Sequence, residues 1–223
     1  DTETLLEAIE IIGIKKTLNK IAGMFAFVIW DKKKRSLTLF RDRMGEKPLY
    51  YGWQGEGGNT SFLFGSDIKA LKQPPYFSSE VNRDALTLYL RHNYVPAPYS
   101  IYRGISKLVP GCILRVSLTE RVPKVWSYWS AVDVVNAGVA NPFKGGADEA
   151  VDQLEKLLMG AVGRQMISDV SLGAFLSGGI DSSLVVALMQ AQSEQPIKSF
   201  SIGFNEQGYN EAVYAKEVAN HLG

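Results

Sequence analysis

Residues 170–183 read VSLGAFLSGGIDSS, and this stretch decides the fold of the second half of the chain. Its apolar beginning has the length of a buried strand, whereas its end places glycines, hydroxyls and a carboxylate in one turn. A periodic apolar stretch that is typical of a helix follows at residues 184–188. Glycine lets the backbone approach an anion closely, and a helix N-terminus presents N–H groups without partners. The stretch therefore predicts a strand, a phosphate-binding turn and a helix.

The composition is that of an ordinary globular protein. The 223 residues are 46% hydrophobic and 21% charged, with a formal net charge of +1, which permits one large or two modest domains. No apolar run approaches the ~18 residues of a membrane span. We therefore expect neither a nucleic-acid nor a membrane partner. The single cysteine, Cys112, cannot form an internal disulfide, and its apolar neighbours favour a buried structural role over a nucleophile.

The first 130 residues combine short strands with peripheral helices. Residues 1–12 have the apolar spacing of a helix, which Asp1 or Thr2 could cap. Residues 24–30 and 36–40 form a predicted hairpin with a solvated, lysine-rich tip. Residues 41–51 form a charged loop, for which an internal salt-bridge network is favoured over a binding site. Further strands are predicted at 61–64, 112–118 and 123–129, and further helices start at Ser66 or Asp67 and at Asn82.

The second half of the chain has a different pattern. Residues 131–146 contain several glycine, proline and asparagine breakers, so we expect a linker there between domains at 1–130 and 147–223. Helix and strand signals alternate after the linker, which predicts parallel strands. A helix is predicted at 147–166, with a buried face of Val151, Leu154, Leu157, Leu158, Ala161 and Val162. The chain begins without methionine in mid-pattern and ends within a helical pattern, so we expect a piece of a longer protein.

Several motifs resemble one family of enzymes. Residues 177–183 match the S-G-G-x-D-S-S pyrophosphate loop of ATP pyrophosphatases, and the flanking GAFL and SIGF runs resemble those of glutamine-hydrolysing asparagine synthetases. In the first half, GMFAF at 23–27, RDRMGEKPLYY at 41–51 and SDIKAL at 66–71 resemble the glutaminase part of the same enzymes. The order and spacing of these motifs agree across nearly the whole chain.

The resemblance implies a fold and a set of sites. The fold is α+β and then α/β: part of an N-terminal-nucleophile glutaminase sandwich, followed by the start of a parallel-sheet ATP-pyrophosphatase domain of the adenine nucleotide alpha hydrolase-like class. Asp1 matches the aspartate that binds the α-amino group of glutamine, although a simple helix cap remains an alternative. The nucleophilic cysteine is expected upstream, so no catalytic residue is expected within these residues. The implied ATP and pyrophosphate ligands are Leu176, Ser177, Gly178, Gly179, Asp181, Ser182, Ser183 and Ile202.

The resemblance also implies a reaction. Aspartate attacks the α-phosphorus of ATP to give a β-aspartyl-adenylate and pyrophosphate, and ammonia from glutamine then gives asparagine and AMP. ATP and Mg²⁺ are the implied cofactors, with Asp181 as the metal ligand, and a cytoplasmic homodimer is expected. A γ-phosphate site is disfavoured because the turn lacks the Gly-Lys-Ser/Thr ending. The alternatives are a β-lactam-synthetase-like ligase or an amidotransferase for another carboxylate, and a non-catalytic nucleotide-binding remnant.

Overall fold

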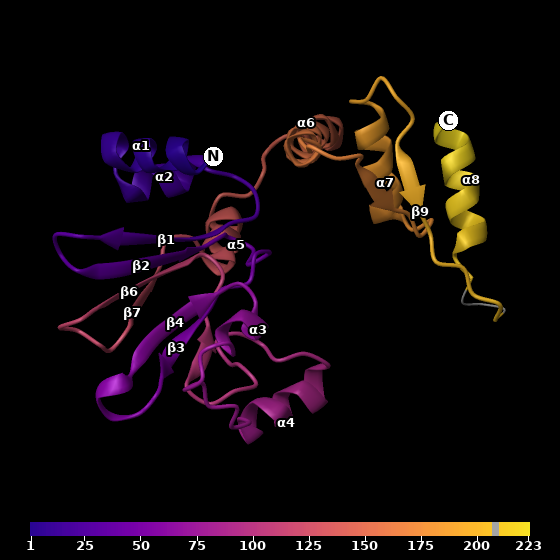
Figure 1. The fold of residues 1–223 in the computed structure, drawn as a ribbon. Helices are drawn as coiled ribbons and strands as arrows, with labels where there is room; N and C mark the ends of the chain where they lie inside the picture. Colours follow the sequence, from indigo (N-terminus) through magenta and orange to yellow (C-terminus); the bar gives the residue numbers. More distant parts are fainter. Residues whose placement is uncertain (207–209) are drawn as a thin grey trace. The chain divides into compact units, whose positions relative to one another are not determined.

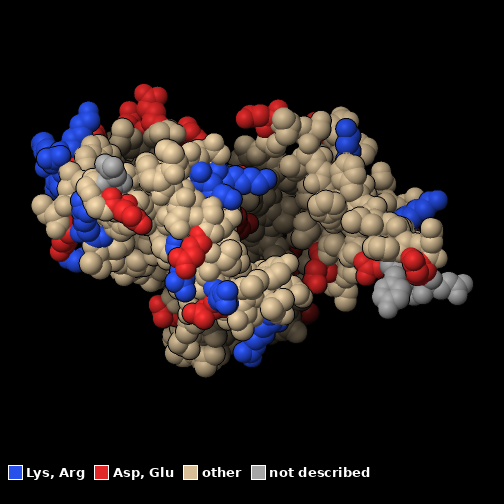
Figure 2. Space-filling view, turned by 60° about the horizontal axis from the view of Figure 1, so that its bottom comes forward, with Lys and Arg blue, Asp and Glu red and all other residues tan. Residues whose placement is uncertain are grey.

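A computed structural model describes residues 1–206 and 210–223, which form two compact units, Asp1–Ala140 and Asn141–Gly223 (Figure 1). Within the described ranges, none of the helices combines the length and hydropathy that a membrane span requires. Basic and acidic side chains are scattered over the face drawn in Figure 2, among larger areas of uncharged residues.

The first unit contains two antiparallel sheets and several helices. One sheet has the strand order β1-β2-β6-β7, with β1 at Ala26–Asp31, β2 at Ser36–Arg41, β6 at Cys112–Ser117 and β7 at Lys124–Ser127. The other has the order β4-β3-β5, with β4 at Ser61–Gly65, β3 at Tyr50–Gln54 and β5 at Ile105–Lys107. The helices are α1 (Thr2–Ile12), α2 (Ile14–Lys20), α3 (Ile68–Leu71), α4 (Arg83–His92) and α5 (Ala131–Ala140), with a 3₁₀ turn at Gly57–Asn59.

Both faces of the first sheet are covered, because side chains on its two central strands alternate between two cores. Leu39 of β2 lies opposite Leu114 of β6, and both are fully buried in the core between the sheets. Their neighbours Phe40 and Ile113 also lie opposite one another, and they pack with Leu18 of α2 on the other face. Figure 1 shows α1 and α2 along that outer face and β3 and β4 on the inner side. The unit is therefore layered as helices, sheet and sheet.

Local sequence signals account for the ends of these elements. The predicted hairpin is confirmed by the β1–β2 register, and its lysine tip is exposed. Asp1, Asp67 and Asn82 each cap the helix that follows, because each side chain accepts a hydrogen bond from a backbone N–H of the first turn. The buried role of Cys112 is also confirmed: it lies in the core between the sheets, where burial raises the pKa of its thiol.

The second unit has the predicted alternation of helix and strand. Strands β8 (Gly173–Phe175) and β9 (Lys198–Phe200) pair in parallel, which confirms the prediction from sequence. Helices α7 (Ile180–Gln190) and α8 (Ala212–Leu222) enclose a small core built on Leu176, Val186 and Ala215. Helix α6 (Ala147–Gln165) packs beside α7.

Two details differ from the sequence-based expectation. The predicted buried face of α6 is wrong: none of its residues is buried, and Val151, Leu154 and Leu157 are 63%, 55% and 71% exposed. Residues 131–146, expected as a linker, contain helix α5, which the sequence analysis did not predict. Gly138 and Asn136 suggested a break there, yet the alanine and valine residues around them continue one helix.

Candidate functional site

The turn between β8 and α7 holds a backbone shape that only glycine adopts readily. Gly178 has φ +80°, in the left-handed region. A Cβ at this position would lie 2.6 Å from the Tyr214 Cβ and 2.9 Å from the Ala215 backbone nitrogen. The turn is therefore packed tightly against the start of α8, which fixes the path of residues 177–179.

Two of the three serine hydroxyls stabilise the turn. Ser177 Oγ and Ser182 Oγ lie 2.9 Å apart, and Ser182 Oγ also accepts from the Ser177 N–H at 3.2 Å and donates to the Gly179 carbonyl at 3.2 Å. Ser183 Oγ differs, because it is buried and has no hydrogen-bond partner in the described part of the chain. A buried hydroxyl without a partner is costly, so this oxygen is a candidate ligand contact.

The turn ends at a helix N-terminus that no side chain caps. Gly179 is the N-cap residue of α7 and provides no side-chain hydrogen bond. The N–H groups of Ile180, Asp181 and Ser182 are those of the first turn, which have no intrahelical acceptor. The Asp181 carboxylate is exposed beside them. The free N–H groups and the positive end of the helix dipole can bind an anion. The Asp181 carboxylate can bind a cation that is coordinated by that anion.

The two predicted adenine contacts differ in what they offer. The Leu176 side chain is buried in the core of the second unit, at 3% exposed, so only its backbone can contact a ligand. Its N–H donates to the Phe200 carbonyl at 2.9 Å, and its carbonyl accepts from the Ser201 hydroxyl. The Ile202 side chain is 69% exposed and free to pack on a ring. The hydrogen bonds tie the strand before the turn to the segment after β9.

A complete protein-built metal site is absent from residues 1–206 and 210–223, where no three His, Cys, Asp or Glu side chains are grouped to hold an ion. Mg²⁺ commonly binds one or two carboxylates together with substrate phosphates and water. Asp181 fits that mode, since it lies next to the candidate phosphate donors. The residues present therefore suit an ion that arrives with a nucleotide.

A second candidate site surrounds Asp1 in the first unit. Asp1 lines an open cavity of about 550 Å³ together with Phe25 and Lys47, among other residues. Its Oδ1 accepts from the Thr2 N–H at 2.6 Å and from the Thr2 hydroxyl at 3.3 Å. One carboxylate oxygen thus caps α1, and Oδ2 has no hydrogen bond to described residues. The cap and the ligand interpretations of Asp1 are compatible.

The charged loop that follows β2 supports this cavity from behind. Asp42 is 1% exposed, and its carboxylate accepts from the N–H groups of Phe25 at 3.3 Å and of Glu46 and Lys47 at 2.9 Å each. Phe25 and Lys47 both line the Asp1 cavity. Asp42 therefore holds two walls of the cavity together, a role that the sequence analysis missed. The sequence did contain a signal for this role: an Arg-Asp pair, residues 41–42, lies shortly before Gly45, whose φ of +71° marks a tight turn.

The predicted salt-bridge network in this loop is wrong. No ion pair between described residues involves the loop's charged side chains, and those of Arg41, Asp42 and Arg43 bind backbone groups instead. Arg41 donates to the carbonyls of Lys47 at 3.0 Å, Gly45 at 2.6 Å and Leu108 at 2.5 Å. Burial lowers the pKa of the Arg41 guanidinium, and the nearby Asp42 charge opposes that shift. A loop without regular structure needs partners for its carbonyls, and Arg41 provides them.

The two units match two different family models. Residues 1–129 match the glutamine amidotransferase domain, and residues 153–223 match asparagine synthase. The first match covers more than half of the 223 residues, so the chain belongs to the glutamine amidotransferase domain family.

Two named relatives are similar along the whole chain. Asparagine synthetase (glutamine-hydrolyzing) 1 of Bacillus subtilis is 33% identical over 223 residues, which cover 100% of this chain and 33% of that protein. A Methanocaldococcus jannaschii protein named putative asparagine synthetase (glutamine-hydrolyzing) 2 is 36% identical over 227 residues. The match covers 100% of this chain and 41% of that protein. The resemblance to glutamine-hydrolysing asparagine synthetases is thereby confirmed. The chain spans about two fifths or less of the length of these relatives.

Proposed function

We propose that this chain is the part of a glutamine-hydrolysing asparagine synthetase in which glutaminase and synthetase meet. The proposed reaction is the ATP-dependent amidation of aspartate to asparagine through a β-aspartyl-adenylate, with release of AMP and pyrophosphate. The observation that carries it is the Ser177–Ser183 turn at the uncapped N-terminus of α7, within a unit that matches asparagine synthase. The names of the relatives agree with this assignment.

In the proposed synthetase site, the turn stabilises the leaving pyrophosphate. The N–H groups at the start of α7 and the Ser183 hydroxyl donate to its oxygens, and Gly178 and Gly179 allow the backbone to approach. The hydroxyls of Ser177 and Ser182 exchange their hydrogen bonds within the turn for bonds to the same oxygens. Preorganised donors of this kind stabilise a transition state by several kcal/mol. In an enzyme where one such donor was removed, the loss was about 2.7–4 kcal/mol. Mg²⁺, when bound at Asp181, would neutralise phosphate charge. The Leu176 backbone and the Ile202 side chain contact the adenine.

In the proposed glutaminase site, Asp1 binds the α-amino group of glutamine through the carboxylate oxygen that does not cap α1. Residues 1–130 are then the C-terminal part of a glutaminase domain, and the nucleophilic cysteine belongs to residues outside these 223. Residues 131–146 connect this glutaminase part to residues 147–223, which are the N-terminal part of an ATP-pyrophosphatase domain. A cytoplasmic location and a homodimer are further expectations from the family resemblance.

Aspartate-dependent exchange of labelled pyrophosphate into ATP tests this function. The assay uses the whole protein, including any residues encoded before or after this chain. We expect exchange with aspartate, and its loss in Asp181→Asn, while glutamine hydrolysis is largely retained. Asp152→Asn is the matched control, because Asp152 is an exposed carboxylate on α6 of the same unit.

The same assay separates the alternatives. Exchange that requires a different carboxylate would replace aspartate as substrate and keep the adenylation chemistry. Absence of exchange with every carboxylate tested would favour a nucleotide-binding remnant. Near wild-type exchange in Asp181→Asn would contradict the role of this side chain.

A further inference from the structure

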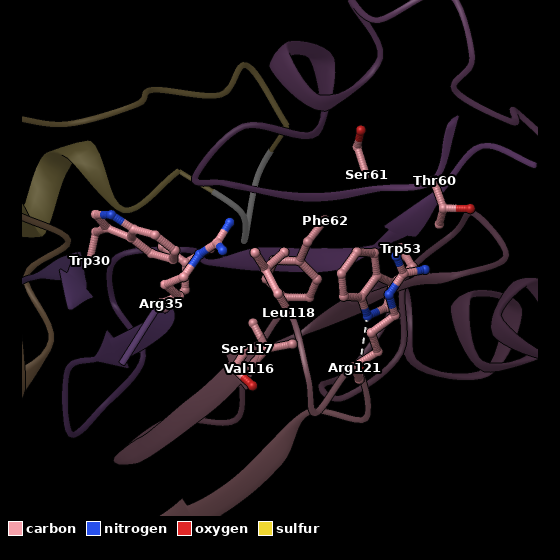
Figure 3. Close-up of a pocket in the computed structure, with 11 residues that line it drawn as sticks. Trp30, Arg35, Trp53, Thr60, Ser61, Phe62, Val116, Ser117, Leu118 and Arg121 are labelled. Carbon is pink, nitrogen blue, oxygen red and sulfur yellow. Dashed lines mark hydrogen bonds between the residues drawn. The ribbon is translucent and has the colours of Figure 1, made fainter. Parts of the chain in front are cut away.

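Three hairpin tips of the first unit enclose a cavity of about 260 Å³ (Figure 3). The tips are residues 31–35 between β1 and β2, residues 55–60 between β3 and β4, and residues 118–123 between β6 and β7. Register places this cavity at one end of the first sheet, where Ser36 pairs with Asp31 and Ser117. Arg41 and the loop that supports the Asp1 cavity lie at the other end of β2.

The cavity has an apolar centre and a tryptophan–arginine pair at each end. Figure 3 shows Arg35 beside Trp30 at one end and Arg121 beside Trp53 at the other, with Phe62 and Leu118 between them. The Arg121 guanidinium carbon lies 5.2 Å from the centre of the Trp53 ring. The Trp53 Nε1–H donates to the Arg121 carbonyl at 2.8 Å. Two contacts between the same residues hold this end of the cavity in place before any ligand binds.

The arginines bring positive charge that acidic residues do not cancel. The cavity has no acidic lining residue, and the ion pairs between described residues involve neither Arg35 nor Arg121. The three tips, residues 31–35, 55–60 and 118–123, contain five Lys and Arg residues and three Asp and Glu residues, so they carry a net charge of +2. Guanidinium groups next to an apolar, aromatic surface suit a carboxylate attached to an apolar body.

We propose that this cavity binds a small aromatic carboxylate, with its ring over Phe62 and Leu118 and its carboxylate on Arg121. The volume sets the size, since sites for drug-sized ligands span roughly 300–1,000 Å³ and this one is slightly smaller. A single ring with a short acidic side chain fits such a space. The site shares no residue with the Asp1 cavity or with the turn before α7, so it does not depend on the proposed synthetase reaction.

Titration with phenylacetate, followed by NMR of the tryptophan indole N–H groups, tests this site. The chain has four tryptophans, and Trp126 and Trp129 are not among the cavity residues. We expect phenylacetate to shift the indole signals of Trp30 and Trp53 and to leave the other two unchanged. The neutral analogue 2-phenylethanol is expected to bind about tenfold more weakly, because it cannot make a charge-assisted hydrogen bond.

Matched arginine variants complete the test. Arg121→Gln is expected to weaken phenylacetate binding by about tenfold or more, and it keeps the backbone carbonyl that Trp53 uses. Arg115→Gln is the control, because Arg115 lies over Trp126 at 5.8 Å and does not line the cavity. Equal weakening in both variants, equal shifts of all four indoles, or no shift at millimolar phenylacetate would overturn the proposal.

A second titration, with a peptide, distinguishes a free acid from a protein partner as the ligand. A short peptide that ends in phenylalanine presents a ring and a carboxylate that are separated by one carbon more than in phenylacetate. Binding no tighter than that of phenylacetate supports a small-molecule site. Binding that is tenfold tighter or more would overturn it in favour of a chain terminus of another protein.

Discussion

Two loops of this chain are rich in polar side chains, and they use those side chains in opposite ways. In the 41–47 loop of the first unit, Arg41 and Asp42 are buried and hydrogen-bonded to backbone groups on several segments. In the 177–183 turn of the second unit, Asp181 is exposed, Ser183 Oγ has no described partner, and the helix N-terminus is uncapped.

The difference shows that the residue types in a loop do not by themselves indicate its role. The first loop has satisfied its donors and acceptors within the protein, so it contributes stability and supports the neighbouring Asp1 cavity. The second has donors left over, so it is suited to a ligand. The inventory of partners, rather than the charge count, separates a structural loop from a binding loop.

The largest effect is expected from Asp42→Asn in the first loop. An amide at this buried position presents N–H₂ donors to groups that are donors themselves, and it leaves Arg41 without a nearby counter-charge. We expect the free energy of unfolding of the first unit to fall by about 3–5 kcal/mol, measured by denaturant titration. Asp31→Asn is the control, since Asp31 also accepts two backbone N–H groups, but on an exposed hairpin tip. A similar loss in both variants would contradict the structural role of burial.

The second loop is sensitive at one backbone position. Gly178→Ala introduces a Cβ at φ +80° and against Tyr214, so we expect the second unit to lose about 1–3 kcal/mol of unfolding free energy. Gly179→Ala is the matched neighbour, because its φ is −73° and its added Cβ would be 3.4 Å from Ser177 Oγ. Thermal unfolding of both variants measures the contrast. Equal destabilisation would show that glycine content, and not the left-handed backbone, matters here.

Alkaline pH should probe the first loop through Tyr128. The Tyr128 hydroxyl donates to the Arg41 carbonyl at 2.9 Å, and burial raises the pKa of this tyrosine from 10.0 to about 12. Below pH 10 the hydroxyl is protonated in both states, whereas between pH 10 and 12 the unfolded state ionises first, so stability falls as pH rises. Because the side chain is only partly buried, we expect a loss of about 1–2 kcal/mol. Tyr128→Phe should show a smaller decline, with the remainder coming from Tyr51, whose pKa burial also raises; an unchanged decline would contradict the assignment.

The smallest stability effect is expected from Asp181→Asn in the second loop. Asp181 is exposed and caps no helix by its side chain, so its replacement should change the unfolding free energy by less than about 0.5 kcal/mol. The same variant is expected to lose pyrophosphate exchange. A large loss of stability would assign Asp181 a structural role and remove the contrast with Asp42.

The sequence predicted the elements whose signals are local. The strand, turn and helix at 170–190, the Asp67 and Asn82 caps, and the β1–β2 hairpin all depend on residues within a few positions of each other. The parallel pairing of β8 with β9 followed from the order of the elements. The ligands named for the 177–183 turn stay predictions.

The missed features depend on contacts between distant residues. Arg41 binds the carbonyl of Leu108, 67 residues away, and Asp42 binds the N–H of Phe25, 17 residues away, so the sequence suggested ion pairs within the loop instead. The pattern of α6 records which side chains are apolar, but not whether a neighbour covers them. Packing partners decide both cases, and periodicity does not identify them.

Amide hydrogen exchange of the whole protein, with and without magnesium pyrophosphate, tests the contrast between the loops most directly. We predict that the amides of residues 180–182, which have no acceptor within α7, exchange quickly in the free protein and become protected by the ligand. The amides of Glu46 and Lys47, which donate to Asp42, should be protected in both conditions. No added protection in residues 180–182, or rapid exchange of Glu46 and Lys47 in the free protein, would contradict the account.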